Sequence, residues 1–188
     1  MWRVNLWEKT VVDWCNFHRV ICTNHFERHA ILLEGIGNVV EIDDTCLAKS
    51  KYNVGRRVSQ QWIFGGYDVE EKVAYLVQVN DRSKRTLEAL IRQYINPRSL
   101  LVIDEWESYA DFDELGYNHI WVNHMEHFVD PDTGACTNHV ESMLQKFKHS
   151  HKKRFGTARN LFGSYIDELM WRQRYKDDLF RHIVEHIV

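Results

Sequence analysis

The fold of this 188-residue chain is decided by two short stretches, Val39-Val40-Glu41-Ile42-Asp43 and Leu100-Leu101-Val102-Ile103-Asp104. Each is a run of aliphatic residues bounded by turn-forming segments, which is typical of a strand buried in a sheet. Each ends on an aspartate, and a carboxylate at the end of a well-packed strand is held rigidly. Because neighbouring strands lie ~4.8 Å apart, the two side chains can converge on one ion. The alternative is that each aspartate only caps its strand and starts a turn.

Around these strands, the hydrophobic pattern predicts a mixed sheet with helices packed on it. Residues 62–67 and 73–79 have the composition of a hairpin with an acidic turn. Residues 83–94 carry apolar side chains at helical spacing, starting from Asp81 or Ser83 as N-cap. A three-stranded meander followed by a helical crossover describes a mixed α/β sheet. The other predicted elements are helices at 1–34, 106–115, 138–149 and 158–188, the last in two pieces, and a strand at 119–122.

The composition excludes several classes of protein. Hydrophobic residues make up 44% of the chain and charged residues 27%, so the chain can bury a core and is not a disordered tail. No apolar run approaches the ~20 residues that a membrane helix needs, and the N-terminus has no secretory apolar region. We therefore expect neither a membrane protein nor a secreted one. Four cysteines are too few for a disulfide scaffold, which favours reduced thiols in an intracellular protein.

Four potential zinc ligands fall on one face of the first predicted helix: Cys15, His18, Cys22 and His25. From Cys15 to His25 this face spans roughly 15 Å of helix. One tetrahedral ion cannot collect four ligands over that length. We therefore expect a buried helix face here and no zinc site.

A third acidic residue of interest, Glu141, lies in the helix predicted from Asn138. The apolar stripe of this helix consists of Val140, Met143, Leu144 and Phe147. Glu141 lies on the shoulder of that stripe, as a metal ligand at a sheet edge would, and Lys148 returns to nearly the same angle, where it could reach a phosphate. The alternative is a capping box, Asn138-x-x-Glu141, in which the glutamate only bonds backbone N–H groups. Spacing alone does not choose between them.

Three converging carboxylates would give a coherent chemistry. Mg²⁺ prefers carboxylate oxygens and keeps waters, so three acids can seat two ions and leave positions for a phosphate. One ion then activates the attacking water or hydroxyl, and the other stabilises the leaving oxygen. The formal net charge of −3 alone argues against a nucleic-acid partner. Positive charge is nevertheless concentrated in one segment that could hold a phosphate backbone, at Lys146, Lys148, Lys152, Lys153 and Arg154.

Six phrases occur in a characteristic order along the chain, at residues 40–45, 51–58, 61–66, 79–83, 103–109 and 128–142. The first reads Val40-Glu41-Ile42-Asp43-Asp44-Thr45, and the last ends in Thr137-Asn138-His139-Val140-Glu141-Ser142. Together they resemble the catalytic domain of Merlin-type DNA transposases, the eukaryotic relatives of a bacterial insertion-sequence transposase family. The resemblance covers about residues 39 to 150.

The resemblance implies a ribonuclease H-like fold, that is, a mixed five-stranded sheet flanked by helices. It implies that Asp43, Asp104 and Glu141 are the catalytic residues and the ligands of two Mg²⁺ or Mn²⁺ ions. The implied partner is DNA, both transposon ends and target, bound by a homodimer. We expect the location to be nuclear if the protein is eukaryotic and cytoplasmic otherwise. The expected DNA-binding residues are Arg56, Arg57, Lys148, Lys152, Lys153 and Arg154, with Asn138 and His124 beside the site.

Three positions depart from the family pattern. Glu105 stands where glycine is usual, Leu144 where tryptophan is usual, and Cys136 where histidine is common. These changes fit a decaying or domesticated copy, whereas the intact triad argues against decay. We expect residues 1–37 to be a helical remnant of an upstream DNA-binding region, 38–155 the catalytic domain and 156–188 a C-terminal helical extension.

The leading hypothesis is therefore a transposase catalytic domain that hydrolyses a phosphodiester at transposon ends and joins the freed 3′-hydroxyl to target DNA. The alternative is a domesticated or degenerate module that binds DNA or protein without catalysis. A third hypothesis, a nuclease or ribonuclease H proper, shares the metal chemistry and differs in its substrate.

Overall fold

The computed structural model describes residues 7–33, 35–47, 61–104, 116–122, 134–154 and 156–187. The chain divides into two compact units. The first unit combines Met1–Ala30 with Ala158–Val188, and the second is Ile31–Thr157. The predicted helix at 106–115 lies outside the described residues.

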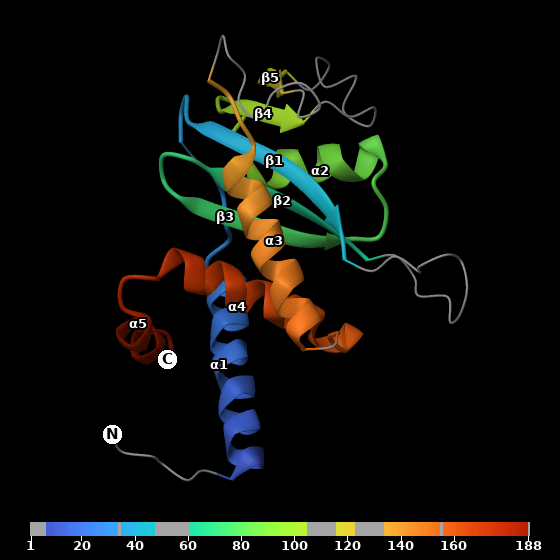
Figure 1. The fold of residues 1–188 in the computed structure, drawn as a ribbon. Helices are drawn as coiled ribbons and strands as arrows, with labels where there is room; N and C mark the ends of the chain where they lie inside the picture. The colour runs from blue at the N-terminus through green and yellow to red at the C-terminus, as the bar shows by residue number, and fades with distance from the viewer. Residues whose placement is uncertain are drawn as a thin grey trace, which may run out of the picture. The chain divides into compact units, whose positions relative to one another are not determined.

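The second unit is built on the predicted mixed five-stranded sheet (Figure 1). Its strand order is β3-β2-β1-β4-β5. Strands β1, β2 and β3 form an antiparallel meander, while β4 pairs parallel with β1 and β5 pairs parallel with β4. This order, with helices on both faces, is the ribonuclease H-like arrangement, so the predicted fold class is confirmed. The strands are β1 (Val39–Cys46), β2 (Trp62–Asp68), β3 (Val73–Val79), β4 (Leu100–Asp104) and β5 (Asn118–Val122).

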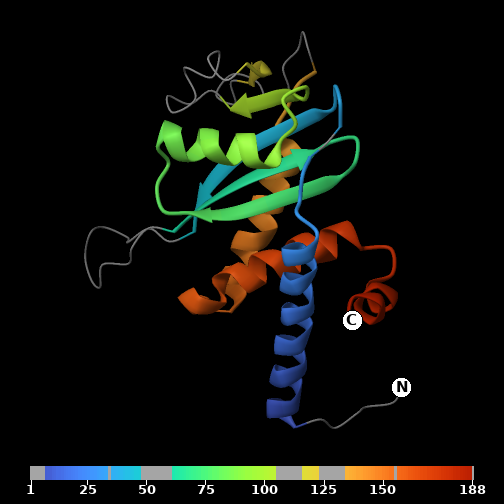
Figure 2. The same cartoon turned by 180° about the vertical axis from the view of Figure 1, so that it is seen from behind.

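Two helices cover opposite faces of this sheet, as the front and back views show (Figures 1 and 2). Helix α2 (Lys84–Tyr94) begins at the predicted N-cap, because the Ser83 side chain accepts from the backbone N–H of Thr86. Helix α3 (Asn138–Lys153) buries the predicted apolar stripe against the other face. It continues past the predicted end at residue 149, because no glycine or proline interrupts the chain before Gly156, which has φ 107°.

Helix α3 approaches β2 closely at Gly65. A Cβ atom added to Gly65 would lie 3.3 Å from Val140 Cγ2, 3.4 Å from Leu144 Cδ2 and only 2.7 Å from Leu76 Cδ2. Gly65 is also the register partner of Asp43 in β1. The absence of a side chain at this position therefore lets α3 lie close to the strand that carries the first candidate acid.

The first unit is helical and consists of α1 (Glu8–Arg28), the 3₁₀ turn η4 (Arg159–Leu161), α4 (Phe162–Arg174) and α5 (Leu179–His186). Helix α1 packs on α4 and α5. The predicted buried face of α1 is only partly correct, since Cys22 and His25 are buried but Cys15 is exposed. Burial raises the pKa of the Cys22 thiol to about 12, so this thiol is packed as an apolar group.

The predicted helix over residues 1–34 is too long. Helix α1 ends at Arg28, and Leu33 joins the other unit through a parallel bridge to Ile95. The backbone N–H of Leu33 donates to the carbonyl of Tyr94 at 2.8 Å, and the N–H of Asn96 donates to the carbonyl of Leu33 at 3.0 Å. Pairing with this distant segment overrides the local helical pattern. Within the described part of the chain, no helix is both long and apolar enough to cross a membrane.

We predict that Gly65→Ala lowers the free energy of unfolding by about 1–3 kcal/mol, as overpacking a core usually does. The new methyl group forces Leu76 to move and pushes on α3. The matched control is Gly163→Ala in α4, where an added Cβ meets nothing within 4 Å, so stability should stay the same or rise slightly. Urea denaturation measures both variants. Equal stability of Gly65→Ala and wild type would contradict the close approach.

Candidate active site

The two aspartates predicted at strand ends lie on adjacent parallel strands. Asp104 does end β4, but β1 continues past Asp43 to Cys46, so the predicted end of that strand is wrong. The register pairs Ile42 of β1 with Ile103 of β4, and one further step along both strands brings Asp43 beside Asp104. Asp104 is in turn paired with Val122 of β5. Both carboxylates therefore stand at the same end of the sheet, because parallel strands end at the same edge.

The Asp43 carboxyl is in an environment that disfavours its charge. Burial is the main cause that raises the pKa of Asp43 to about 7. The backbone N–H of Asp44, 2.6 Å from Asp43 Oδ1, acts in the opposite direction. Three negative charges add to the increase, those of Asp44, Glu141 and Asp104. A like charge raises the pKa of a carboxyl only from close by, so the three predicted acids share one electrostatic environment.

Asp44 belongs to the opposite face of β1. Its side chain is 3% exposed and pairs with Arg82, whose Nε lies 2.6 Å from Asp44 Oδ2 and whose Nη2 donates to Oδ1 at 2.7 Å. The guanidinium of Arg82 also lies 4.1 Å from the ring centre of Trp62. Asp44 is therefore paired with a cation, whereas the charged groups that act on Asp43 are acidic.

Glu141 is one residue too far along α3 for the capping box that its spacing suggested. The N-cap of α3 is Thr137 rather than Asn138, and the Thr137 side chain makes no capping bond. Glu141 is thus the fourth helical residue, whereas a capping box needs its glutamate at the third. Its Oε1 accepts from the hydroxyl of Thr137 at 3.2 Å, and the side chain is half-buried.

A fourth acid, Glu41, was missed as a site residue by sequence reasoning. It is 1% exposed and belongs to the same face of β1 as Asp43. Its Oε2 accepts from the backbone N–H groups of His139 at 2.7 Å and Val140 at 3.0 Å. Its Oε1 lies 2.6 Å from His139 Nδ1. The one available signal was a carboxylate in the middle of an otherwise apolar strand, because a buried charge requires partners.

The predicted DNA-binding residues lie in three different situations. Lys148 is half-buried, and its Nζ donates to Thr45 Oγ1 of β1 at 3.1 Å. The other predicted cations of α3 are exposed at the end of that helix: Lys152, Lys153 and Arg154. Outside the described residues lie Arg56, Arg57 and His124, together with Glu105.

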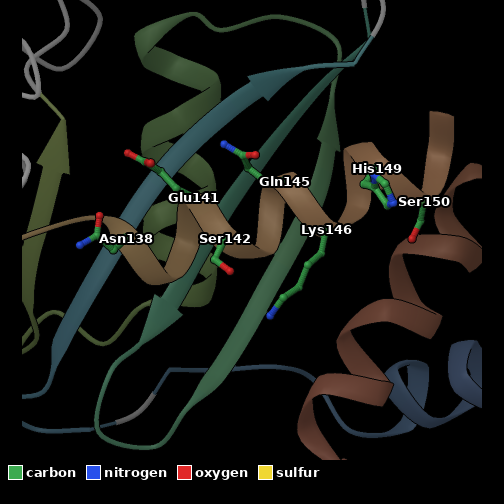
Figure 3. Close-up of a pocket in the computed structure, with 7 residues that line it drawn as sticks. All are labelled: Asn138, Glu141, Ser142, Gln145, Lys146, His149 and Ser150. Carbon is green, nitrogen blue, oxygen red and sulfur yellow. The ribbon is translucent and has the colours of Figure 1, made fainter. Parts of the chain in front are cut away.

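A polar hollow of about 620 Å³ runs along the outer side of α3 from Asn138 to Ser150. Figure 3 shows Glu141 and Gln145 projecting to one side of the helix, and Ser142 and Lys146 to the other. The described residues that line the hollow recur along α3 at the spacing of a helical face: Asn138, Glu141, Ser142, Gln145, Lys146, His149 and Ser150. Glu141 therefore lies at one end of an open polar surface, and the exposed cations of α3 follow beyond the other end.

The donor set fits a hard divalent cation by its chemistry, since Asp43, Asp104 and Glu141 offer carboxylate oxygens. As placed, however, the residues that the structure describes contain no group of three histidine, cysteine, aspartate or glutamate side chains that could hold a metal ion. The described cysteines and histidines of α1 form no such group either. None of the four cysteines, all of which belong to the described residues, forms a disulfide.

Comparison with known proteins gives a consistent picture. The family model of the ISXO2-like transposase domain matches residues 33–174. A curated protein of Haemophilus influenzae, described as an uncharacterized transposase-like protein, is 30% identical over 103 residues, which are 52% of this chain and 78% of that protein. These matches confirm the predicted relationship to bacterial insertion-sequence transposases without singling out the Merlin-type branch. They give no support to a nuclear location.

Retroviral integrases are among the similar solved structures. The simian T-cell lymphotropic virus intasome, solved with the PP2A regulatory subunit B56 gamma, contains a chain that is 9% identical with a TM-score of 0.48. The similarity covers 75% of this chain and 50% of that one. The HTLV-2 integrase catalytic core, solved with magnesium in a trimeric form, is 12% identical with a TM-score of 0.46, covering 76% and 86%. The BIV integrase catalytic core is 11% identical with a TM-score of 0.46, covering 71% and 81%.

The family match covers residues 33–174, which include the whole five-stranded sheet and the helices α2, α3 and α4. The chain belongs to the ISXO2-like transposase domain family.

Proposed function

We propose that this chain catalyses the metal-dependent cleavage of phosphodiester bonds at transposon ends and the joining of the freed 3′-hydroxyl to target DNA. The observation that carries the proposal is the placement of Asp43 and Asp104 on adjacent parallel strands, with α3 and its Glu141 anchored over β1. Membership in a transposase family supplies the substrate class.

Asp43, Asp104 and Glu141 would hold the metal ions. Two Mg²⁺ or Mn²⁺ ions, when bound, would activate the attacking oxygen and stabilise the leaving one. The two aspartates are held rigidly, because Asp43 lies within β1 and Asp104 ends β4, and both strands are paired on both sides. Asp44 pairs with Arg82 on the other face of the sheet, so its carboxylate already has a cationic partner. The three acids are then left as a negative cluster, which suits a divalent cation.

The surface of α3 provides the remaining binding elements. Polar side chains line the hollow beside Glu141, among them Ser142 and Gln145. Hydroxyl and amide groups of this kind commonly hydrogen-bond the sugar–phosphate backbone of DNA. The exposed cations Lys152, Lys153 and Arg154 would bind DNA phosphates farther from the reacting bond. Because transposition joins two ends, we expect two copies of the chain to act together on DNA.

One observation favours the alternative function, a module that binds DNA without cleaving it. Within the described residues, no group of three ligands stands ready for a metal. Glu141 accepts a hydrogen bond from Thr137 at the start of its own helix, so its carboxylate would have to turn toward the aspartates. The enzymatic function therefore requires that this short rearrangement occurs when metal and DNA bind.

We predict that Asp104→Asn and Glu141→Gln each lower Mg²⁺- or Mn²⁺-dependent nicking by at least about 100-fold, since each removes a ligand charge from a two-metal site. DNA affinity should change by less than about threefold. The substrate is a supercoiled plasmid that carries the two DNA ends flanking the coding sequence, and the control variant is the exposed turn residue Glu71→Gln. If wild type and both variants bind these ends equally and none cuts them, the chain is a binding module.

We predict that the triple variant Lys152→Ala/Lys153→Ala/Arg154→Ala weakens DNA binding and reduces its salt dependence. Each phosphate contact contributes about 0.9 to the slope of log K against log salt concentration, so the slope should fall by up to about 3. Fluorescence anisotropy between 50 and 200 mM salt, roughly the range over which such contacts are lost, measures the slope. The control Arg85→Ala/Arg92→Ala/Arg98→Ala removes the same charge from exposed residues in and just after α2. Equal slopes for the two triple variants would exclude a specific role for the α3 cations.

We predict that Asp43→Asn stabilises the metal-free protein at high pH. Because the pKa of Asp43 is raised to about 7 in the folded chain and an unfolded aspartate ionises near 3.9, the native carboxyl binds its proton more tightly than the unfolded one. Ionised Asp43 therefore costs stability progressively from about pH 4 to pH 7, and the cost is constant above that. Each pH unit is worth about 1.4 kcal/mol, so the variant should gain up to about 4 kcal/mol at pH 8.

The same variant should gain almost nothing at about pH 3, below both pKa values, where the carboxyl is largely protonated in the folded and the unfolded chain. Urea denaturation at the two pH values measures the difference, with Glu71→Gln as the control. Saturating Mn²⁺ should stabilise wild type at pH 8 and leave Asp43→Asn unchanged, because only a bound native state is stabilised by a ligand. A pH-independent effect of Asp43→Asn would contradict the buried, like-charged environment.

A further inference from the structure

We propose that Glu41 is the positioning residue that sets where Glu141 stands over the two aspartates. This inference rests on the proposed function. Glu41 belongs to the centre of the sheet, is 1% exposed, and precedes Asp43 by two residues on the same face of β1. It contacts neither the hollow nor solvent directly, so it acts through the helix that carries Glu141.

Glu41 replaces the side chain that normally caps a helix. The first N–H groups of a helix have no partner within it, and an N-cap side chain usually satisfies those of the second and third residues. In α3 these are His139 and Val140, and the Thr137 side chain makes no capping bond. Both N–H groups donate to Glu41 Oε2 instead. A carboxylate is also favoured at the positive end of the helix dipole.

The side chain of His139 also holds the start of α3 on the sheet, through contacts with β1 and β2. Its Nδ1 lies 2.6 Å from Glu41 Oε1 and donates to this carboxylate. Its ring stacks on Tyr67 with 5.2 Å between ring centres and an angle of 8°. Tyr67 is the cross-strand partner of Glu41 in β2. One buried carboxylate and one aromatic ring, on neighbouring strands, therefore hold the first turn of the helix.

A second contact fixes the helix farther along the same strand. Lys148 Nζ donates to Thr45 Oγ1, so α3 touches β1 on both sides of Asp43. From His139 to Lys148 the helix rises roughly 13.5 Å, and from Glu41 to Thr45 the strand extends roughly 13 Å. The two spans are similar in length, so one helix and one strand can make both contacts at once, and each contact resists a shift of α3 relative to β1.

The consequence is a fixed relation between the acids. Glu141 follows the capped residue His139 by two positions, and Asp43 follows the capping residue Glu41 by two positions. Moving α3 by one residue along its axis would displace Glu141 by about 1.5 Å, and a misplacement of about 1 Å in a catalytic group can cost 100-fold in rate. Glu41 thereby selects the helix position in which Glu141 can reach the metal ions.

The test compares Glu41→Gln with Asp68→Asn. Asp68 is also fully buried, but its carboxylate binds Asn38 and the backbone N–H of Glu71 rather than α3. Three properties are measured on the full chain: hydrogen exchange of the His139 and Val140 amides, Mn²⁺ affinity without DNA, and the kcat and KM for nicking plasmid-borne end DNA.

For Glu41→Gln we expect the two amides to exchange at least about tenfold faster, which corresponds to the loss of roughly one hydrogen bond. Mn²⁺ binding should weaken by about the same factor. The kcat should fall at least about tenfold, while KM for DNA stays within about twofold of wild type. Asp68→Asn should lose stability without these three changes. Glu41→Asp retains the charge on a shorter side chain, so its kcat should lie between those of wild type and Glu41→Gln. The same three measurements are made on Glu41→Asp if Glu41→Gln does not fold.

The outcomes separate the two levels of the proposal. Unchanged amide exchange in Glu41→Gln would overturn the anchoring role, whether or not the chain cuts DNA. Faster exchange with wild-type Mn²⁺ affinity and kcat would show a structural cap and overturn the positioning role. A wild-type chain that neither binds Mn²⁺ nor cuts DNA would remove the proposed function, and the positioning role with it, while the amide exchange would still report the cap.

Discussion

The parallel pairing of β1 with β4 is the constraint on which the rest of the site depends. A carboxylate at the end of a single strand has no functional consequence, but two at the same edge repel each other and require a counter-charge. The sheet makes this arrangement obligatory, since the register that pairs Ile42 with Ile103 also brings Asp43 beside Asp104. The hydrophobic contacts of both strands thus stabilise a local concentration of negative charge.

The second requirement is that a helix from a distant part of the sequence returns to this edge. Helix α3 achieves it with an apolar stripe against the sheet, a close approach at Gly65 and two polar contacts with β1. Apolar packing alone tolerates sliding, whereas a buried carboxylate that must satisfy two N–H groups does not. Apolar packing therefore holds α3 on the sheet, and the contacts of Glu41 and Lys148 fix the position of α3 along β1.

The sequence predicted those features that have a local cause. Apolar runs located β1 and β4 with their aspartates, although β1 runs on to Cys46, and the serine before a helical repeat located the start of α2. It could not predict the role of Glu41, whose partner His139 is 98 positions away and has no local signature. The start of α3 at Asn138 was predicted correctly, but a capping box at Asn138 was left open, because Thr137 and Asn138 are both residues that favour caps. The predicted helix over residues 1–34 was too long because a distant segment intervenes: Leu33 pairs its backbone with the segment around Ile95.

Family membership and fold establish what the chain is related to, and the acids decide what it can do. Anomalous X-ray diffraction from crystals of the full chain grown with MnCl₂ tests that point most directly, because it locates bound ions without reference to any assay. The predicted result is Mn²⁺ held by carboxylate oxygens of Asp43, Asp104 and Glu141 at about 2.2 Å, with two ions about 4 Å apart. An empty sheet edge at saturating Mn²⁺, with Glu141 still turned toward Thr137, would contradict the existence of a shared metal site.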